Sequence, residues 1–101
     1  MTLHLVIHRP DGSAGSAEEA AVRAALRETV WEVADSHWEA SEEALLVSTD
    51  LSPDYLLSHF RRGLARRGYP SAGVLLVVPV APNSAWSGLP DDAAEWVKSL
   101  L

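Results

Sequence analysis

Hydrophobic positions recur along the chain with two different periods, and four segments show the pattern that is typical of strands. Residues 2–8 (TLHLVIH) alternate strictly and predict a first strand. Residues 37–40 and 44–49 predict two short strands that are joined so closely that they must be antiparallel neighbours. The apolar block at 74–80 (VLLVVPV) predicts the last strand, and Pro79 places it at a sheet edge because proline has no N–H for the strand ladder.

The segments between these strands carry helix signals. Ser16 opens a capping-box pattern (SAEE), and apolar residues at helical spacing continue over 17–35. Residues 52–54 (SPD) are a strong helix start, and Gly68 is a matching stop. A third, terminal helix is expected after Pro90.

This order of elements predicts the split β-α-β layout, repeated once and followed by a C-terminal helix. The expected fold class is α+β: a ferredoxin-like β-α-β-β-α-β sandwich with sheet order 4-1-3-2. Right-handed crossovers would place both long helices on one face of the sheet. The chain of 101 residues is the length of one domain, so residues 1–101 are interpreted as a single unit.

The expected sheet is apolar on both faces, although its helices can cover only one. Leu3, Leu5 and Ile7 are expected to face the helices, which leaves the other side of the first strand uncovered. An uncovered apolar face favours self-association, so we expect a homodimer that packs sheet against sheet. The predicted interface residues are His4, Val6, His8 and Leu46. The alternative is that the C-terminal helix folds back over this face.

Composition narrows the function classes. The chain has no cysteine, so disulfides and thiolate chemistry are excluded, and no apolar run approaches the length of a membrane span. We therefore predict a cytoplasmic protein without a membrane partner. The net charge of −6 argues against general nucleic-acid binding. The basic residues are nevertheless clustered on the second helix, and this cluster is a candidate anion-binding or partner-binding site: Arg61, Arg62, Arg66 and Arg67.

Three stretches resemble a known family: 38–52 (WEASEEALLVSTDLS), 73–80 (GVLLVVPV) and 86–101 (WSGLPDDAAEWVKSLL). They are similar to the small SinR-like proteins, which belong with the CRISPR-associated Cas-two-like proteins and the VapD ribonuclease toxins. The resemblance implies a ferredoxin-like fold and a homodimer. In the nuclease members an acidic residue at the end of the first strand binds metal, whereas residues 7–11 here read IHRPD, with His8 and Arg9 at that point.

Two carboxylates are weak catalytic candidates. We expect Asp11 and Asp50 to lie close together, on the premise that the first and third strands are parallel and end at the same edge. A pair of carboxylates could bind Mg²⁺ or Mn²⁺, or perform acid–base chemistry, although Asp50 also fits a helix-start role. His4 and His8 could likewise be metal ligands, but their spacing favours an interface role.

The sequence thus predicts a non-catalytic or weakly catalytic homodimeric binding or regulatory module without a cofactor. By resemblance, its setting is a bacterial defence or toxin–antitoxin system, and a protein partner is plausible. One alternative is a metal-dependent RNA or DNA endonuclease of the same fold. Another is a structural dimerisation subunit of a larger complex.

Overall fold

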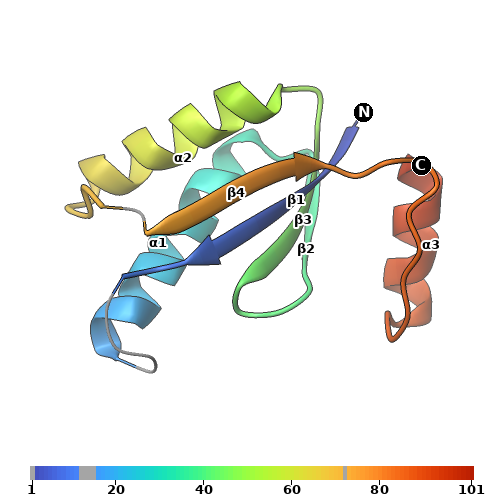
Figure 1. Ribbon diagram of the computed structural model, residues 1–101, viewed down its shortest axis with the longest axis horizontal. Helices are drawn as coiled ribbons and strands as arrows, with labels where there is room; N and C mark the ends of the chain where they lie inside the picture. Colours follow the sequence, from blue (N-terminus) through green and yellow to red (C-terminus); the bar gives the residue numbers. More distant parts are fainter. Residues whose placement is uncertain (1, 12–15, 72) are drawn as a thin grey trace.

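Four strands form one antiparallel sheet, and three helices accompany it (Figure 1). A computed structural model describes residues 2–11, 16–71 and 73–101. The elements in chain order are β1 (Thr2–Arg9), α1 (Ala17–Val33), β2 (Ser36–Glu39), β3 (Ala44–Thr49), α2 (Pro53–Arg66), β4 (Val74–Pro79) and α3 (Asp91–Leu100). This α+β architecture is compatible with a ferredoxin-like fold, and each predicted strand and helix is present within two residues of its expected bounds.

The predicted cap residues begin the two long helices. The Ser16 hydroxyl accepts a hydrogen bond from the Glu19 backbone N–H at 3.0 Å, and the Ser52 hydroxyl accepts one from the Tyr55 N–H at 3.2 Å. These bonds satisfy N–H groups that the first turn of a helix leaves without partners. Gly68 has a φ of +91° directly after the last turn of α2, which is the stop that the sequence predicts.

The strand order is β2-β3-β1-β4, which reads β4-β1-β3-β2 from the opposite edge. β4 is therefore an edge strand, as Pro79 predicts. All three neighbouring pairs are antiparallel, including β1 with β3, in which Thr2 lies opposite Thr49 and Ile7 opposite Ala44. The expectation that the first and third strands run parallel is wrong, because β2 and β3 are joined by a tight turn and the strand beside β1 is the returning one.

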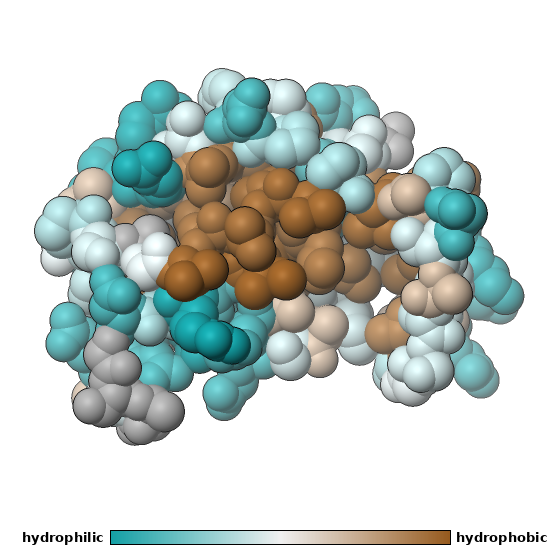
Figure 2. All heavy atoms as spheres, viewed as in Figure 1, coloured by the Kyte–Doolittle hydropathy of each residue, from teal (hydrophilic) through white to brown (hydrophobic). Residues whose placement is uncertain are grey.

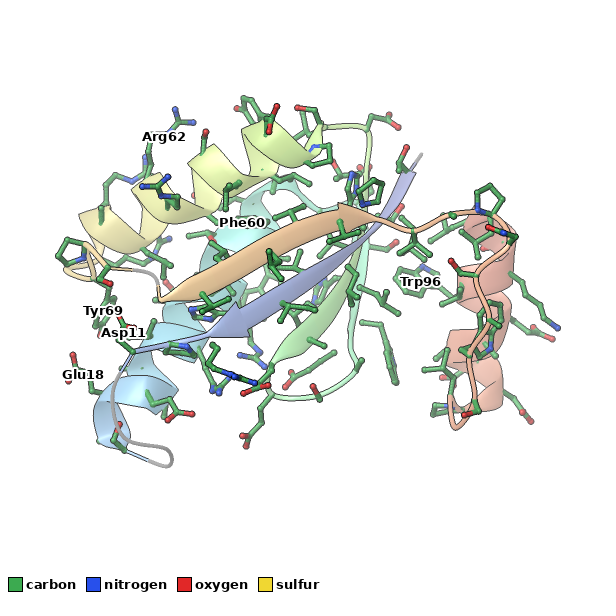
Figure 3. The ribbon with its side chains drawn as sticks, viewed as in Figure 1. Asp11, Glu18, Phe60, Arg62, Tyr69 and Trp96 are labelled. Atoms are coloured by element: carbon green, nitrogen blue, oxygen red, sulfur yellow. The ribbon has the colours of Figure 1, made fainter. Side chains whose placement is uncertain are left out.

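The two long helices cover one face of the sheet and form the core with it (Figures 1 and 3). Phe60 on α2 is completely buried between the helix and the sheet. α1 and α2 also approach each other closely, since a Cβ at Gly63 would overlap the Cγ2 of Thr29. Glycine is unfavourable inside a helix, and at this position it permits the close packing of α1 and α2.

The orientation of β1 is the reverse of the expected one. Val6 lies opposite Leu45 and Val77, and all three belong to or pack against the helix-side core. His4 and His8 share the side of Val6 because side chains alternate along a strand, so Leu3, Leu5 and Ile7 are directed to the other face. Alternation alone defines two sets of residues. Which set is covered depends on pairing with β3 and β4.

Helix α3 stands at one end of the sheet, on the side away from α1 and α2 (Figure 1). Ala93 and Val97 are its buried residues, and the Trp96 indole N–H donates a hydrogen bond to the Ser36 hydroxyl at 3.0 Å. Leu3, at the end of β1 nearest to α3, is 1% exposed. The C-terminal helix therefore covers this end of the face, and it does not cover the rest.

Candidate functional site

The face of the sheet opposite α1 and α2, here called the open face, carries apolar side chains on all four strands, with Ser36 and Ser48 beside Leu3 at one end. Strand register places Trp38, Leu46, Leu5 and Val78 side by side in one row across β2, β3, β1 and β4. The next row contains Ala44, Ile7 and Leu76. Arg9 and Glu43 form an ion pair at 3.4 Å at the margin of this face, so charge is found at its rim. Apolar residues in the centre and charges at the rim are typical of protein interfaces.

The open face remains exposed where α3 does not reach it. On β4, the exposed fractions are 53% for Val74, 50% for Leu76 and 45% for Val78. Figure 2 shows a continuous hydrophobic region over the middle of the molecule, bordered by hydrophilic residues above and below. A large exposed apolar patch on a protein surface is typical of a site that binds another molecule.

A groove separates the open face from the C-terminal segment. It encloses about 420 Å³ and is lined by sheet residues that include Leu5, Leu46 and Val78, and on the other side by Trp86, Leu89 and Val97. Figure 3 shows Trp96 in the space between α3 and the sheet. The open face is thus a shallow apolar surface with a wall at one end.

Only Leu46 among the four predicted interface residues lies on this face. His4, Val6 and His8 are 1%, 0% and 2% exposed under the helices, so their placement on the uncovered side is wrong. Burial lowers the pKa of His4 from its ordinary value of 6.5, against weaker opposing contributions from backbone hydrogen bonds at Thr2 and Val47. The Nδ1 of His4 is buried without a partner. His4 is therefore a neutral core residue of the covered face.

The sequence reasoning missed Leu3, Leu5, Ile7 and Trp38 as residues of the open face. The alternation along β1 separates these aliphatic residues from His4, Val6 and His8. Because aliphatic residues are usually buried, the sequence predicted that Leu3, Leu5 and Ile7 would face the core. The structure places this set outward and covers the two histidines instead. The outward set is therefore the more hydrophobic one, which strengthens the case for a covering partner.

Asp11 and Asp50 do not lie together. Because β1 and β3 are antiparallel, Asp11 follows the Arg9 end of the sheet and Asp50 lies beside the Thr2 end. Asp11 accepts a hydrogen bond from the Ser71 hydroxyl at 2.6 Å and lies near Tyr69 and Glu18 (Figure 3). Within the described ranges, no group of three or more His, Asp and Glu side chains is arranged to hold a metal ion. The predicted carboxylate pair is therefore not formed within one chain.

The four clustered arginines divide into two groups. Arg67 bonds to Glu28 at 2.9 Å and to the Gly63 carbonyl oxygen at 3.0 Å, so it ties α2 to α1. Arg61, Arg62 and Arg66 are exposed, and Arg61 and Arg62 line a shallow hollow of about 340 Å³ together with Ser58, Ala65 and Pro70. Arg67 thus has a structural role, whereas the other three are available to a partner.

Comparisons with known proteins identify no relative. No protein-family model, curated protein or solved structure matches the chain. None of the helices in the described part of the chain is both long enough and apolar enough to pass through a bilayer.

Proposed function

We propose that this protein is a homodimeric binding or regulatory module, non-catalytic or weakly catalytic, whose copies associate through the open face. We further propose a ferredoxin-like sandwich of order 4-1-3-2 that is related to the SinR-like and Cas-two-like proteins. Resemblance in the sequence supports this kinship and, with it, a cytoplasmic role in a bacterial defence or toxin–antitoxin system.

The observation that carries the proposal is the apolar row Trp38, Leu46, Leu5 and Val78, which continues to an exposed edge strand. Complete burial of an aliphatic side chain contributes about 1.5–3 kcal/mol. Covering the half-exposed Val74, Leu76 and Val78 would therefore contribute about 1 kcal/mol each, from a surface that water otherwise contacts.

A second copy fits this surface better than a charged partner does. A two-fold interface joins the same patch on both subunits, so the patch must be complementary to itself. An apolar centre satisfies that condition, because it brings no like charges together. The whole molecule measures 36 × 27 Å when it is viewed along its shortest axis, and the open face is one part of that outline. A standard interface buries roughly 800 Å² on each partner, so most of this side of the molecule would take part in the contact.

The endonuclease alternative receives less support from the geometry. It would require strand-end carboxylates that share Mg²⁺ or Mn²⁺, and Asp11 and Asp50 lie at opposite ends of the sheet. A dimer would also leave the covered histidines His4 and His8 away from the interface, since both lie under the helices.

Light scattering after size exclusion tests the proposal directly. We expect a dimer at micromolar concentration and a monomer for Leu76→Glu, because a carboxylate within a dry interface loses its hydration. Tyr55→Glu on α2 is the matched control, since Tyr55 is 48% exposed and Leu76 is 50% exposed. We expect the control to remain a dimer.

Two outcomes would overturn the proposal. The first is a wild-type protein that remains monomeric up to about 100 µM, which would exclude the micromolar dimer expected here. Each factor of ten in Kd corresponds to about 1.4 kcal/mol in the free energy of association. A dimer that tolerates Leu76→Glu would show that the copies associate through another surface. Circular dichroism of both variants separates a lost interface from a lost fold.

A further inference from the structure

Ion pairing on this protein is uneven. Arg9, Arg23, Arg27 and Arg67 each pair with a glutamate of the same chain. In contrast, no carboxylate within the described ranges lies at ion-pair distance from the three exposed arginines of α2. The chain contains 14 acidic residues against 8 basic ones, so an unpaired cluster of arginines is not due to a shortage of carboxylates.

These arginines lie on one exposed strip of α2. This strip, here called the arginine stripe, consists of exposed residues three or four positions apart: Tyr55, Ser58, Arg62 and Arg66. Arg61 lies beside them on the same helix. Residues at this spacing are neighbours on a helix surface. Figure 3 shows Arg62 pointing away from the sheet and the core. Next to it, the hollow between Ser58, Arg61 and Pro70 gives the stripe a concave part.

We propose that the arginine stripe is a docking surface for an acidic segment of a partner protein. Guanidinium groups form two parallel hydrogen bonds with carboxylates, which gives both attraction and orientation. Arg62 and Arg66 are separated by one helical turn, or about 5–6 Å between Cβ atoms. A partner helix with glutamates four residues apart presents carboxylates at the same spacing.

A protein segment suits the stripe better than a nucleic acid does. Nucleic acids carry charge continuously, and a strand that left this short stripe would meet a protein with a net charge of −6. Tyr55, which is 48% exposed at the other end of the stripe, adds an aromatic side chain of the kind that is enriched with arginine at protein interfaces. A short acidic segment would contact the arginines and Tyr55 without reaching the acidic remainder of the surface.

This inference is independent of the proposed dimer. The arginine stripe lies on α2, which covers the face of the sheet opposite the open face. A protein that proved to be monomeric could therefore still bind an acidic segment. Equally, loss of binding at the stripe would leave self-association unchanged.

The test uses a synthetic helical peptide of 14 residues with glutamates at positions i, i+4 and i+8, and a matched peptide with glutamines at these positions. Fluorescence anisotropy with the full chain at about 50 mM salt should show binding of the glutamate peptide and at least tenfold weaker binding of the glutamine peptide. Arg62→Glu should weaken the glutamate peptide about tenfold, because one attraction becomes a repulsion. Lys98→Glu makes the same charge change on α3 and should leave binding within twofold.

Three results would overturn the inference. The first is no binding of the glutamate peptide up to millimolar concentration. The second is an equal effect of Arg62→Glu and Lys98→Glu, which would mean a response to net charge alone. The third is tighter binding of a 20-nucleotide single-stranded DNA or RNA that is lost in Arg62→Glu, which would assign the stripe to nucleic acid. Arg62→Gln repeats the measurement with a smaller change if the charge reversal disturbs α2.

Discussion

The two faces of this sheet are built by the same strands, yet the long helices cover only one of them. On β4, Leu75 and Val77 pack against the helices, whereas Leu76 and Val78, which alternate with them, are about half exposed. On β1 the difference is greater, because the covered side includes two histidines and the open side is entirely aliphatic from Leu3 to Ile7. The face that carries more hydrophobic side chains on β1 is therefore the one that α1 and α2 leave uncovered.

Hydrophobicity alone therefore does not determine which face becomes the core. Covering a face requires helices of sufficient length, and α1 and α2 are both connected so that they lie on the same side. α3 is short and covers only the end of the open face. The apolar surface that remains on the second face is the basis of the proposed association between copies.

The largest expected effect belongs to the covered face. Phe60→Ala removes a completely buried ring from the contact between α2 and the sheet. We expect a loss of about 3–5 kcal/mol in the free energy of unfolding, which combines lost burial with the cavity that remains. Urea denaturation measures this loss. A loss below about 1 kcal/mol would mean that the helices contribute little to this core.

The contact between the two long helices gives the next effect. Gly63→Ala should destabilise the protein by about 1–3 kcal/mol because the new methyl group overlaps Thr29, even though alanine favours helix formation. Thr29→Ser removes the Cγ2 and keeps the hydroxyl that donates to the Leu26 carbonyl oxygen at 2.7 Å. In the Thr29→Ser background, the same glycine substitution should become neutral or stabilising. Thermal melts of the four proteins form the cycle, and equal costs in both backgrounds would contradict the overlap.

Neighbouring valines on β4 compare the two faces directly. Val77→Ala should lower the free energy of unfolding by about 1–2 kcal/mol at every protein concentration, because Val77 packs on the helix-side core. Val78→Ala should cost less than about 0.5 kcal/mol in the dilute monomer. At high concentration its cost should rise, because the proposed dimer would lose apolar contact. Denaturation at 1 µM and 100 µM separates the two, and costs independent of concentration for both residues would argue against the open-face interface.

The smallest expected effect is a pH dependence of the covered face. Burial lowers the pKa of His4 from 6.5, so protonation favours the unfolded chain, where the imidazole is in water. The contribution of His4 to stability is therefore complete above about pH 6.5 and declines as the pH falls below this value. His4→Leu should make the stability of the protein less dependent on pH between 5 and 7 than that of the wild type. The same slope for both proteins, measured by urea denaturation, would contradict this account.

Dimerisation should not share this pH dependence through His4 or His8. Both were expected at the interface, and both lie under the helices. A dimer constant that changes when His4 is replaced would mean that the copies associate through a surface other than the open face.

The sequence alone determined the elements of this protein and where they begin and end. Local signals suffice for that, since Ser16 and Ser52 bond to the first turns of their helices and Gly68 has the positive φ that ends α2. It also predicted the edge position of β4, because Pro79 cannot donate to a neighbouring strand. The surplus of apolar residues for one covered face was equally visible in composition and alternation.

Which way each strand faces, and which residues meet, depends on tertiary contacts. The period of a strand separates its residues into two sets, but pairing with β3 and β4 selects the set that the helices cover. Strand direction separates Asp11 from Asp50 for the same reason. Among the described residues, the glutamates on α1 form ion pairs with Arg67 and not with the other arginines of α2, because helix packing determines which side chains reach one another. These choices depend on contacts between segments that are distant in the chain, and no local pattern encodes them.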